Sequence, residues 1–254
     1  SGDERRQVFI TTHQDEFARV GASAIVAKSL SIGTSFERMT PKLALEQSNR
    51  MAITAYRHPL LQFPDQPLVL VEGKFDAVYI RQGLSAAGIK PRWRLADPDE
   101  LTGDLTGGDA FKSYLRYNAA AIKSRPDSAP IIVVRDWETK DEEAYTKHLK
   151  GHAHSKAVTM PESMCTAGLG KGWAGIERYL PINFIESLVP DDDLLRRGNG
   201  TIEPEKAMLE NHKQAMARQF DITQFPAPNL VELARWIDDQ VAMVLDNIPT
   251  EAFF

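Results

Sequence analysis

The chain has little cysteine, no long apolar run and no basic segment followed by an apolar one at its start, and each of these absences argues against a class of protein. The single thiol, Cys165, cannot form an internal disulfide, which favours a reducing, cytoplasmic location. Purely apolar runs such as residues 68–71 and 131–134 are only a few residues long, whereas a membrane-spanning helix needs about 20 apolar residues. No basic segment followed by an apolar one opens the sequence. We therefore expect a cytoplasmic protein with no membrane partner.

Positive charge is also scarce, since the formal net charge is −5. This balance argues against a protein that binds nucleic acid through bulk charge. If the substrate is a polyanion, a local feature such as a bound metal ion must overcome the repulsion. The length of 254 residues, with 43% hydrophobic and 26% charged residues, predicts one main soluble domain with extensions.

Short apolar strands alternate with helical segments in the middle of the chain. The patterns predict strands at residues 68–71, 92–96, 131–134 and 156–160, and helices at 75–87, 110–123 and 141–150. This alternation favours an α/β fold with a parallel sheet that is covered by helices.

The two ends of the chain have different patterns. Before the alternating region we expect a strand at 6–12, one or two short strands within 21–36 that break at Gly33, and a helix from 41 to about 57. After it we expect a glycine-rich loop at 164–175, turns at 191–193 and 198–200, and amphipathic helices at 204–220 and 230–248 that pack on the core.

Four acidic residues follow two of the predicted strands. Glu72 ends the first strand and Asp76 falls in the first turn of the next helix, with Gly73 allowing a tight turn between them. Asp136 and Glu138 are two residues apart, so an extended backbone directs both to the same face. Ligands bind beyond the carboxyl ends of parallel strands, so the four carboxylates converge on one pocket if the two strands are neighbours.

Such a cluster predicts a site for a hard divalent cation. Carboxylates in a dry crevice repel one another and take up protons unless a cation compensates. Magnesium-like ions prefer oxygen ligands, and two such ions about 3.5–4 Å apart can activate a water and stabilise the leaving oxygen of a phosphodiester. The alternative is that these residues are surface carboxylates or charges favoured at helix N-termini.

The same residues resemble those of a known family. The segments LVEGKFD at 70–76 and IIVVRDWE at 131–138 resemble the TOPRIM fold, in which a Glu-Gly and a later Asp-x-Asp bind magnesium. Position 138 is Glu where the family pattern usually has Asp. Residues 8–17 are similar to the switch-histidine segment of ABC-type ATPase domains, and residues 176–181 are similar to a stretch downstream of TOPRIM in OLD (overcoming lysogenization defect) nucleases.

The resemblance implies an α/β TOPRIM (Rossmann-like) parallel sheet flanked by helices. Residues 1–62 would be the end of an ATPase domain and a connecting helix, 63–185 the TOPRIM catalytic domain, and 186–254 a helical extension packed on it. The metal ligands carried over by position are Glu72, Asp76, Asp136 and Glu138, with Glu177 as a further candidate that could equally be a surface helix residue. Lys171, in the glycine-rich loop, would be the cation beside the scissile phosphate, and its alternative is a solvated loop lysine.

By this resemblance we expect an endonuclease that hydrolyses DNA with Mg²⁺ or Mn²⁺, by a two-metal mechanism, in phage defence or DNA processing. Its partners would be DNA and the ATPase domain of the full-length protein. The resemblance also allows the full-length protein to form a homodimer. The alternatives are an effector that cleaves RNA, for instance tRNA, and a non-catalytic TOPRIM module that regulates an ATPase. Comparing plasmid with tRNA as the substrate separates DNA cleavage from RNA cleavage. A rise in melting temperature with metal ions separates a metal-binding enzyme from a non-catalytic module.

Three other patterns carry less weight. Residues 170–175 match the dinucleotide fingerprint Gly-x-Gly-x-x-Gly but follow no convincing strand. The sequence contains no P-loop motif, so no complete ATP site is expected. His152, His154 and Cys165 have no standard zinc spacing, and we expect them at the surface.

Overall fold

The computed structural model describes residues 24–30, 33–40, 65–73, 75–96, 108–139, 142–205 and 209–248. The chain divides into two compact units, Ser1–His58 and Pro59–Phe254. The strand expected at 6–12, the segment that resembles an ATPase switch and the helix expected at 41–57 lie outside the described residues.

The described part of the first unit is a β-hairpin. Strand β1 (Ala24–Leu30) pairs antiparallel with β2 (Gly33–Met39), from Ala24 opposite Met39 to Leu30 opposite Gly33. The sequence predicted one or two strands here with a break at Gly33. Two strands are confirmed, and the second begins at that glycine and extends beyond the predicted end.

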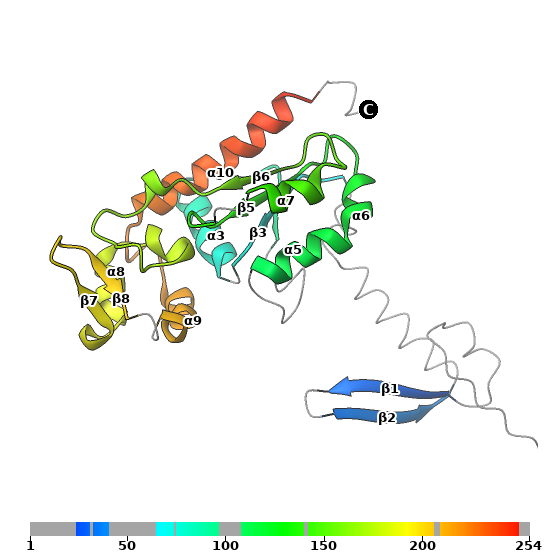
Figure 1. Cartoon of the computed structure of the whole chain (residues 1–254), viewed down its shortest axis with the longest axis horizontal. Coiled ribbons are helices and arrows are strands. Elements are labelled where there is room, and N and C mark those ends of the chain that lie inside the picture. The colour runs from blue at the N-terminus through cyan, green and yellow to red at the C-terminus, as the bar shows by residue number, and fades with distance from the viewer. Residues whose placement is uncertain are drawn as a thin grey trace, which may run out of the picture. The chain divides into compact units, whose positions relative to one another are not determined.

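The second unit contains a four-stranded parallel sheet in the order β4-β3-β5-β6. Figure 1 labels β3, β5 and β6 of this sheet. Its strands are β3 (Leu68–Val71), β4 (Arg94–Ala96), β5 (Ile131–Arg135) and β6 (Lys156–Thr159). All residues of β3 and β5 are buried, as expected for central strands with helices on both faces. The predicted α/β class is confirmed, and the two strands that precede the acidic residues are adjacent.

The alternation of side chains along the strands divides the core into two clusters. Leu68, Leu70, Ile131 and Val133 pack with α5 (Gly108–Tyr117), α6 (Ala119–Lys123) and α7 (Glu142–Leu149). Val69, Val71, Ile132 and Val134 belong to a larger cluster with α3 (Asp76–Ala86) and α10 (Pro228–Asp246).

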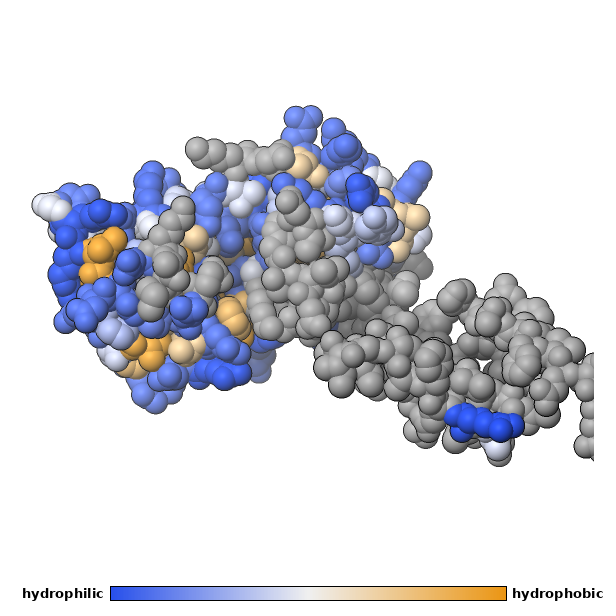
Figure 2. Space-filling model, turned by 60° about the horizontal axis from the view of Figure 1, so that its bottom comes forward, coloured by the Kyte–Doolittle hydropathy of each residue, from blue (hydrophilic) through white to orange (hydrophobic). Residues whose placement is uncertain are grey.

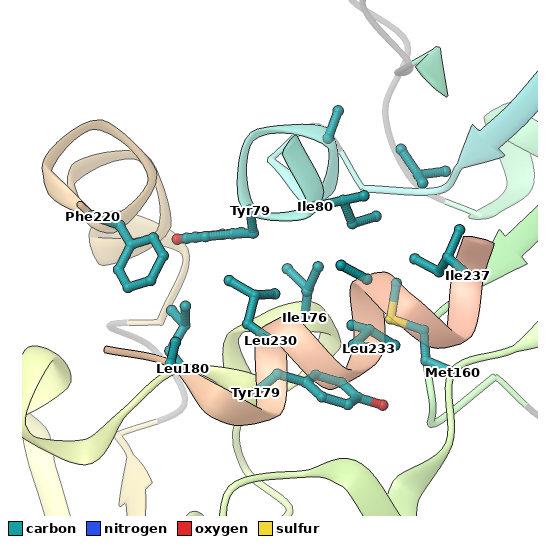
Figure 3. Packing of buried hydrophobic residues seen from close by; sticks show 14 of the residues in the cluster. Tyr79, Ile80, Met160, Ile176, Tyr179, Leu180, Phe220, Leu230, Leu233 and Ile237 are labelled. Carbon is teal, nitrogen blue, oxygen red and sulfur yellow. The ribbon is translucent and has the colours of Figure 1, made fainter. Parts of the chain in front are cut away.

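The larger cluster joins the sheet to the last helix of the chain. Figure 3 shows Tyr79 and Ile80 of α3 facing Leu230, Leu233 and Ile237 of α10. The helix predicted at 230–248 is therefore confirmed, with its start moved to Pro228, a residue favoured in the first turn of a helix. Because α10 covers α3, it holds the helix that carries Asp76 against the sheet.

Several predicted boundaries were wrong. The segment 110–123 forms two helices rather than one, which are separated at Asn118, whose side chain donates to the Tyr114 carbonyl (2.9 Å). The helix expected from 204 begins at Leu209 (α9, Leu209–Gln219), and Pro204 instead ends a strand.

A hairpin and three short helical segments were not predicted. Strand β7 (Leu194–Arg196) pairs antiparallel with β8 (Ile202–Pro204), and the expected turn at 198–200 connects them. The turn expected at 191–193 is the 3-10 turn η4 (Asp191–Asp193). Helix α8 (Ile182–Leu188) follows Pro181, while η2 (Glu162–Met164) ends at the first residue of the predicted glycine-rich loop and η3 (Gly175–Tyr179) begins at its last residue.

The described surface of the second unit is mainly hydrophilic on the face shown in Figure 2, where hydrophobic residues form small separate patches. Among described residues, the exposed large hydrophobic side chains are Tyr117, Leu195 and Met243. In the described ranges, every helix falls short of the length and apolarity that a bilayer crossing requires.

Candidate metal centre

Glu72 and Asp136 follow directly on neighbouring parallel strands. The last residue of β3, Val71, is in register with Val134 of β5, so the two strand ends lie at the same edge of the sheet. Asp136 is surrounded by the other acids: burial raises its pKa well above the ordinary value, and the charges of Asp76, Glu138, Glu72 and Glu177 raise it further. The structure therefore brings all five predicted metal-ligand candidates into one electrostatic cluster.

Asp76 is held by the backbone of the turn before it. It is the first residue of α3 and is 4% exposed, and its Oδ2 accepts a hydrogen bond from the Gly73 N–H at 2.7 Å. A Cβ at position 73 would lie 2.4 Å from Asp76 Oδ1, so only glycine permits this approach. Burial raises the pKa of Asp76 to about 6, against the lowering effects of the Gly73 hydrogen bond and Lys213.

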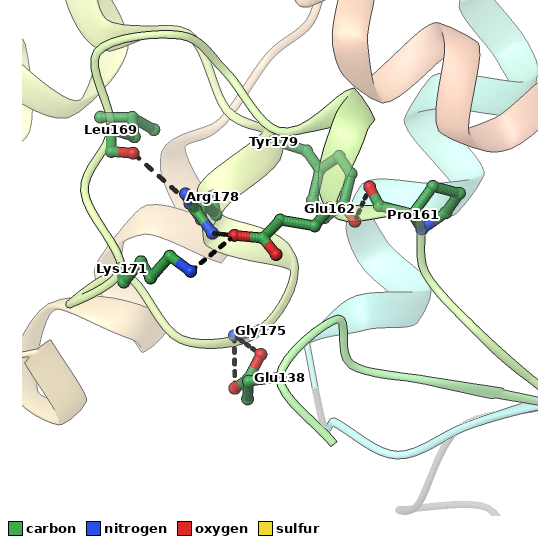
Figure 4. A network of polar contacts seen from close by, with 8 residues as sticks. All are labelled: Glu138, Pro161, Glu162, Leu169, Lys171, Gly175, Arg178 and Tyr179. Carbon is green, nitrogen blue, oxygen red and sulfur yellow. Dashed lines mark hydrogen bonds and ion pairs between the residues drawn. The ribbon is translucent and has the colours of Figure 1, made fainter. Parts of the chain in front are cut away.

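Glu138 is held in the same way by a second glycine. The Gly175 N–H donates to both carboxylate oxygens of Glu138, at 2.9 and 3.2 Å (Figure 4). Gly175 has φ +73°, and a Cβ there would lie 3.1 Å from Glu177 Oε2 and 3.4 Å from Asp136 Oδ2. The loop at Gly175 therefore closely approaches three carboxylates.

Glu177 is buried rather than on the surface. It belongs to η3 and is only 3% exposed, so the surface alternative considered from the sequence was wrong. Its Oε2 and the Asp136 Oδ2 both lie near Gly175. This places Glu177 inside the cluster even though more than 35 residues separate it from Glu138 along the chain.

Two buried carboxylate oxygens in the cluster have no hydrogen-bond partner among the described residues. Glu72 Oε1 accepts a hydrogen bond from the Tyr145 hydroxyl at 2.9 Å, whereas Glu72 Oε2 is buried and unpartnered, as is Asp136 Oδ1. Burial also raises the pKa of Glu72, against the lowering effects of the Tyr145 hydrogen bond, Arg135 and Lys112. Buried acceptors without a donor are unfavourable by about 1–3 kcal/mol, so these two atoms suit a cation.

The donor set fits a hard cation in its chemistry, because it consists of carboxylate oxygens without thiolate or imidazole. Among the residues that the structure describes, however, no three His, Cys, Asp or Glu side chains are arranged to hold an ion. Asp76, Glu138 and Glu72 each accept from a different donor, namely Gly73, Gly175 and Tyr145. A carboxylate has two oxygens and several acceptor sites, so these hydrogen bonds leave each group able to bind a cation as well.

Lys171 lies in a different network. Its ammonium pairs with Glu162 Oε1 at 3.2 Å, and Arg178 contacts the same oxygen at 3.2 Å (Figure 4). The side chain of Lys171 is 73% exposed. The cations that act on the clustered carboxylates are instead Arg135 and Lys112, near Glu72, and Lys213, near Asp76.

Arg135, Tyr145 and Lys213 were missed by sequence reasoning. A charged residue at the end of the buried strand β5 was a usable signal for Arg135, since Arg is rarely fully buried without a partner. No local pattern marks Tyr145 on α7 or Lys213 on α9, because only the packing of these helices brings them to the carboxylates.

The discounted residues have ordinary partners. His152 is buried, contrary to the expected surface position, and its ring nitrogens contact the Pro126 carbonyl (3.0 Å) and the Ser155 hydroxyl (3.1 Å). Cys165 is half-buried and free of disulfides. Trp137 packs at the edge of the larger core cluster, with the Arg178 guanidinium 4.2 Å from its ring centroid.

Comparisons of the chain with protein-family models, with curated proteins and with solved structures found no match.

Proposed function

We propose that the chain is a divalent-metal-dependent endonuclease domain that hydrolyses DNA phosphodiester bonds at the edge of the sheet where β3 and β5 end. The observation that carries this proposal is the pair of buried, unpartnered oxygens, Glu72 Oε2 and Asp136 Oδ1, on neighbouring strand ends. A cation would relieve both. A chain of net charge −5 also needs such a cation to approach a polyanion.

Mg²⁺ or Mn²⁺ would be held by Glu72, Asp76, Asp136, Glu138 and Glu177, with two ions as the number that the TOPRIM resemblance implies. When bound, such ions supply Lewis-acid polarisation of the phosphate and activation of a water. The chain itself orients the ligands: the Gly73 and Gly175 N–H groups hold Asp76 and Glu138, and Tyr145 holds Glu72. Lys213 supplies a positive charge near Asp76.

The proposed family is TOPRIM, in the OLD arrangement in which an ATPase precedes the nuclease. Support comes from the sequence resemblance and from a Rossmann-like sheet whose adjacent strands β3 and β5 precede the Glu-Gly and Asp-x-Glu residues. In this proposal the protein acts in the cytoplasm on DNA, in phage defence or DNA processing, and the ATPase domain is its partner.

The test is cleavage of supercoiled plasmid by the purified chain with Mg²⁺, with Mn²⁺ and with EDTA, and with total tRNA as a parallel substrate. We expect plasmid cleavage that requires metal and is abolished in Glu72→Gln and Asp136→Asn. Asp192→Asn, an exposed carboxylate on η4, is the matched control and should cleave normally. Preferential cleavage of tRNA would replace DNA by RNA as the substrate.

A second candidate function is a non-catalytic module that regulates an ATPase. It is favoured by the lack, within the described ranges, of three acidic or other ligand side chains positioned for an ion. This rival predicts no cleavage of either substrate and no rise in melting temperature with Mn²⁺. A metal-induced rise that is lost in Asp136→Asn would exclude it.

A further inference from the structure

Arg135 is a buried cation that the proposed chemistry does not use. It is the last residue of β5 and is 1% exposed, and within the described part of the chain its Nε and Nη1 have no hydrogen-bond partner. Its Nη2 donates to the hydroxyl of Thr159, the residue opposite it on β6. Burial of a charged group with unpaired donors is unfavourable, so this position needs an explanation beyond packing.

The guanidinium of Arg135 contacts the aromatic ring of Tyr145. The Arg135 Cζ lies 5.1 Å from the ring centroid, within the range of a cation–π interaction. Tyr145 is itself fully buried on α7, so its ring is confined between the sheet and the neighbouring helix residue Phe111, whose ring centroid is 6.1 Å away. Arg135 therefore restricts where the hydroxyl of Tyr145 can lie.

That hydroxyl donates to Glu72. The bond to Oε1 (2.9 Å) leaves Oε2 as the unpartnered oxygen. Hydrogen bonds from surrounding residues commonly orient the carboxylates that bind metals, and their loss lowers metal affinity about 10–100-fold. The contacts thus form a continuous chain from β6 through β5 and α7 to the strand end of β3.

We propose that Arg135 and Tyr145 are positioning residues, in which the buried guanidinium fixes the Tyr145 ring so that its hydroxyl orients Glu72 and leaves Oε2 for a divalent cation. This inference rests on the proposed function, because it assigns these residues to the same metal site. Neither residue touches substrate in this role. The planar group of Arg135 acts through Tyr145, in addition to the effect of its charge on Glu72, and Tyr145 acts through Glu72.

The experiment is Mn²⁺ titration of the full chain by calorimetry, with the electron paramagnetic resonance spectrum of bound Mn²⁺ as a second signal. We expect Tyr145→Phe, which keeps the ring and loses the hydroxyl, to weaken Mn²⁺ binding about 10-fold or more and to alter the spectrum. The control is Tyr114→Phe, a buried tyrosine of the same core cluster whose charged neighbour is Arg125 rather than Glu72. It should bind Mn²⁺ as the unaltered chain does.

The role of Arg135 is tested by a double-mutant cycle. Arg135→Lys keeps the charge but loses the planar group, so it should weaken Mn²⁺ binding in the original chain and have little effect in the Tyr145→Phe background. Equal effects in both backgrounds would show that Arg135 does not act through Tyr145. If Arg135→Lys does not fold, Tyr145→Phe alone still decides whether the hydroxyl orients Glu72.

The outcomes separate this inference from the proposed function. If the original chain binds Mn²⁺ and Tyr145→Phe binds it equally well, the positioning role is refuted and the metal site stands. If the original chain binds no Mn²⁺, the metal site and the inference both fail. Melting temperatures in EDTA show whether any variant acts only by loss of stability.

Discussion

At the scale of single residues, Gly175 and Gly88 share a left-handed backbone but differ in what surrounds them. Gly175 has φ +73° and a Cβ there would meet Glu177 Oε2, whereas Gly88 has φ +69° and nothing within 4 Å. At either position, the backbone strain caused by alanine should lower the free energy of unfolding by about 1–2 kcal/mol.

We predict that only Gly175→Ala also loses the rise in melting temperature caused by Mn²⁺, because the added methyl would lie 3.1 Å from Glu177 Oε2 and crowd that carboxylate. Thermal melts with Mn²⁺ and with EDTA make the comparison, and Gly88→Ala is the strain-matched control. Full metal-induced stabilisation in Gly175→Ala would mean that this loop is not part of the metal site.

The charge on Asp76 should make the metal-free protein sensitive to pH. Burial raises the pKa of Asp76 to about 6 from the model-peptide value of 3.8. The protonated form is therefore favoured by folding: its contribution is complete below the unfolded-state pKa and is lost as pH rises through about 6. By the relation between pKa shifts and free energy, this loss is about 3 kcal/mol at most.

We predict that Asp76→Asn unfolds at higher denaturant concentration than the original chain at pH 8 in EDTA, with a smaller difference at pH 5. The amide keeps an oxygen that can accept from the Gly73 N–H, and it removes the buried charge. Urea denaturation at the two pH values measures the difference. If Asp76→Asn and the original chain differ in stability by the same amount at both pH values, the ionised form of Asp76 does not destabilise the folded protein.

At the scale of elements, two segments each carry a lysine that is a candidate for contact with the phosphate, namely α9 and the loop before η3. Helix α9 brings the charge of Lys213 to Asp76, while the loop holds Lys171 against Glu162. If a lysine stabilises the charge that develops on the phosphate, its loss should lower the cleavage rate about 100-fold.

We predict a larger loss of plasmid cleavage for Lys213→Met than for Lys171→Met, measured as initial rates at saturating Mg²⁺. The exposed Lys147 on α7 provides the control substitution, Lys147→Met. A larger loss for Lys171→Met would return the catalytic role to the glycine-rich loop, as the sequence resemblance implied.

At the scale of the whole molecule, both described core clusters belong to residues 59–254. The sheet, the helices on its two faces and the C-terminal helix α10 all lie in this unit. The segment 186–254, expected as a helical extension, contributes α9, α10 and the β7–β8 hairpin to it.

We predict that a fragment of residues 59–254 folds alone, because both described core clusters consist of residues from this unit. Circular dichroism should show one cooperative thermal transition, and Mn²⁺ should raise its midpoint as in the full chain. A fragment that melts without cooperativity would show that residues 1–58 complete its core.

The sequence was informative where the signal is local. The apolar runs at 68–71 and 131–134 predicted the two central strands, and the acids after them were placed correctly at strand ends. Local signals failed at Asn118, where a side-chain hydrogen bond accompanies a break between helices, and at Pro204, which joined a strand through pairing with Leu194. Such breaks depend on partners that periodicity does not show.

The amino-acid sequence by itself determined the α/β class, and it placed four acidic residues near strand ends: Glu72, Asp76, Asp136 and Glu138. It could do so because the periodicities of strands and helices are visible in residues that are close together in the chain. Tertiary structure decided that β3 and β5 are adjacent, that Glu177 is buried with them and that Tyr145 and Lys213 reach the carboxylates. Those facts depend on strand order and helix packing, which arise from contacts between residues far apart in the chain. The carboxylates come from local sequence, and their shared, desolvated environment comes from the fold.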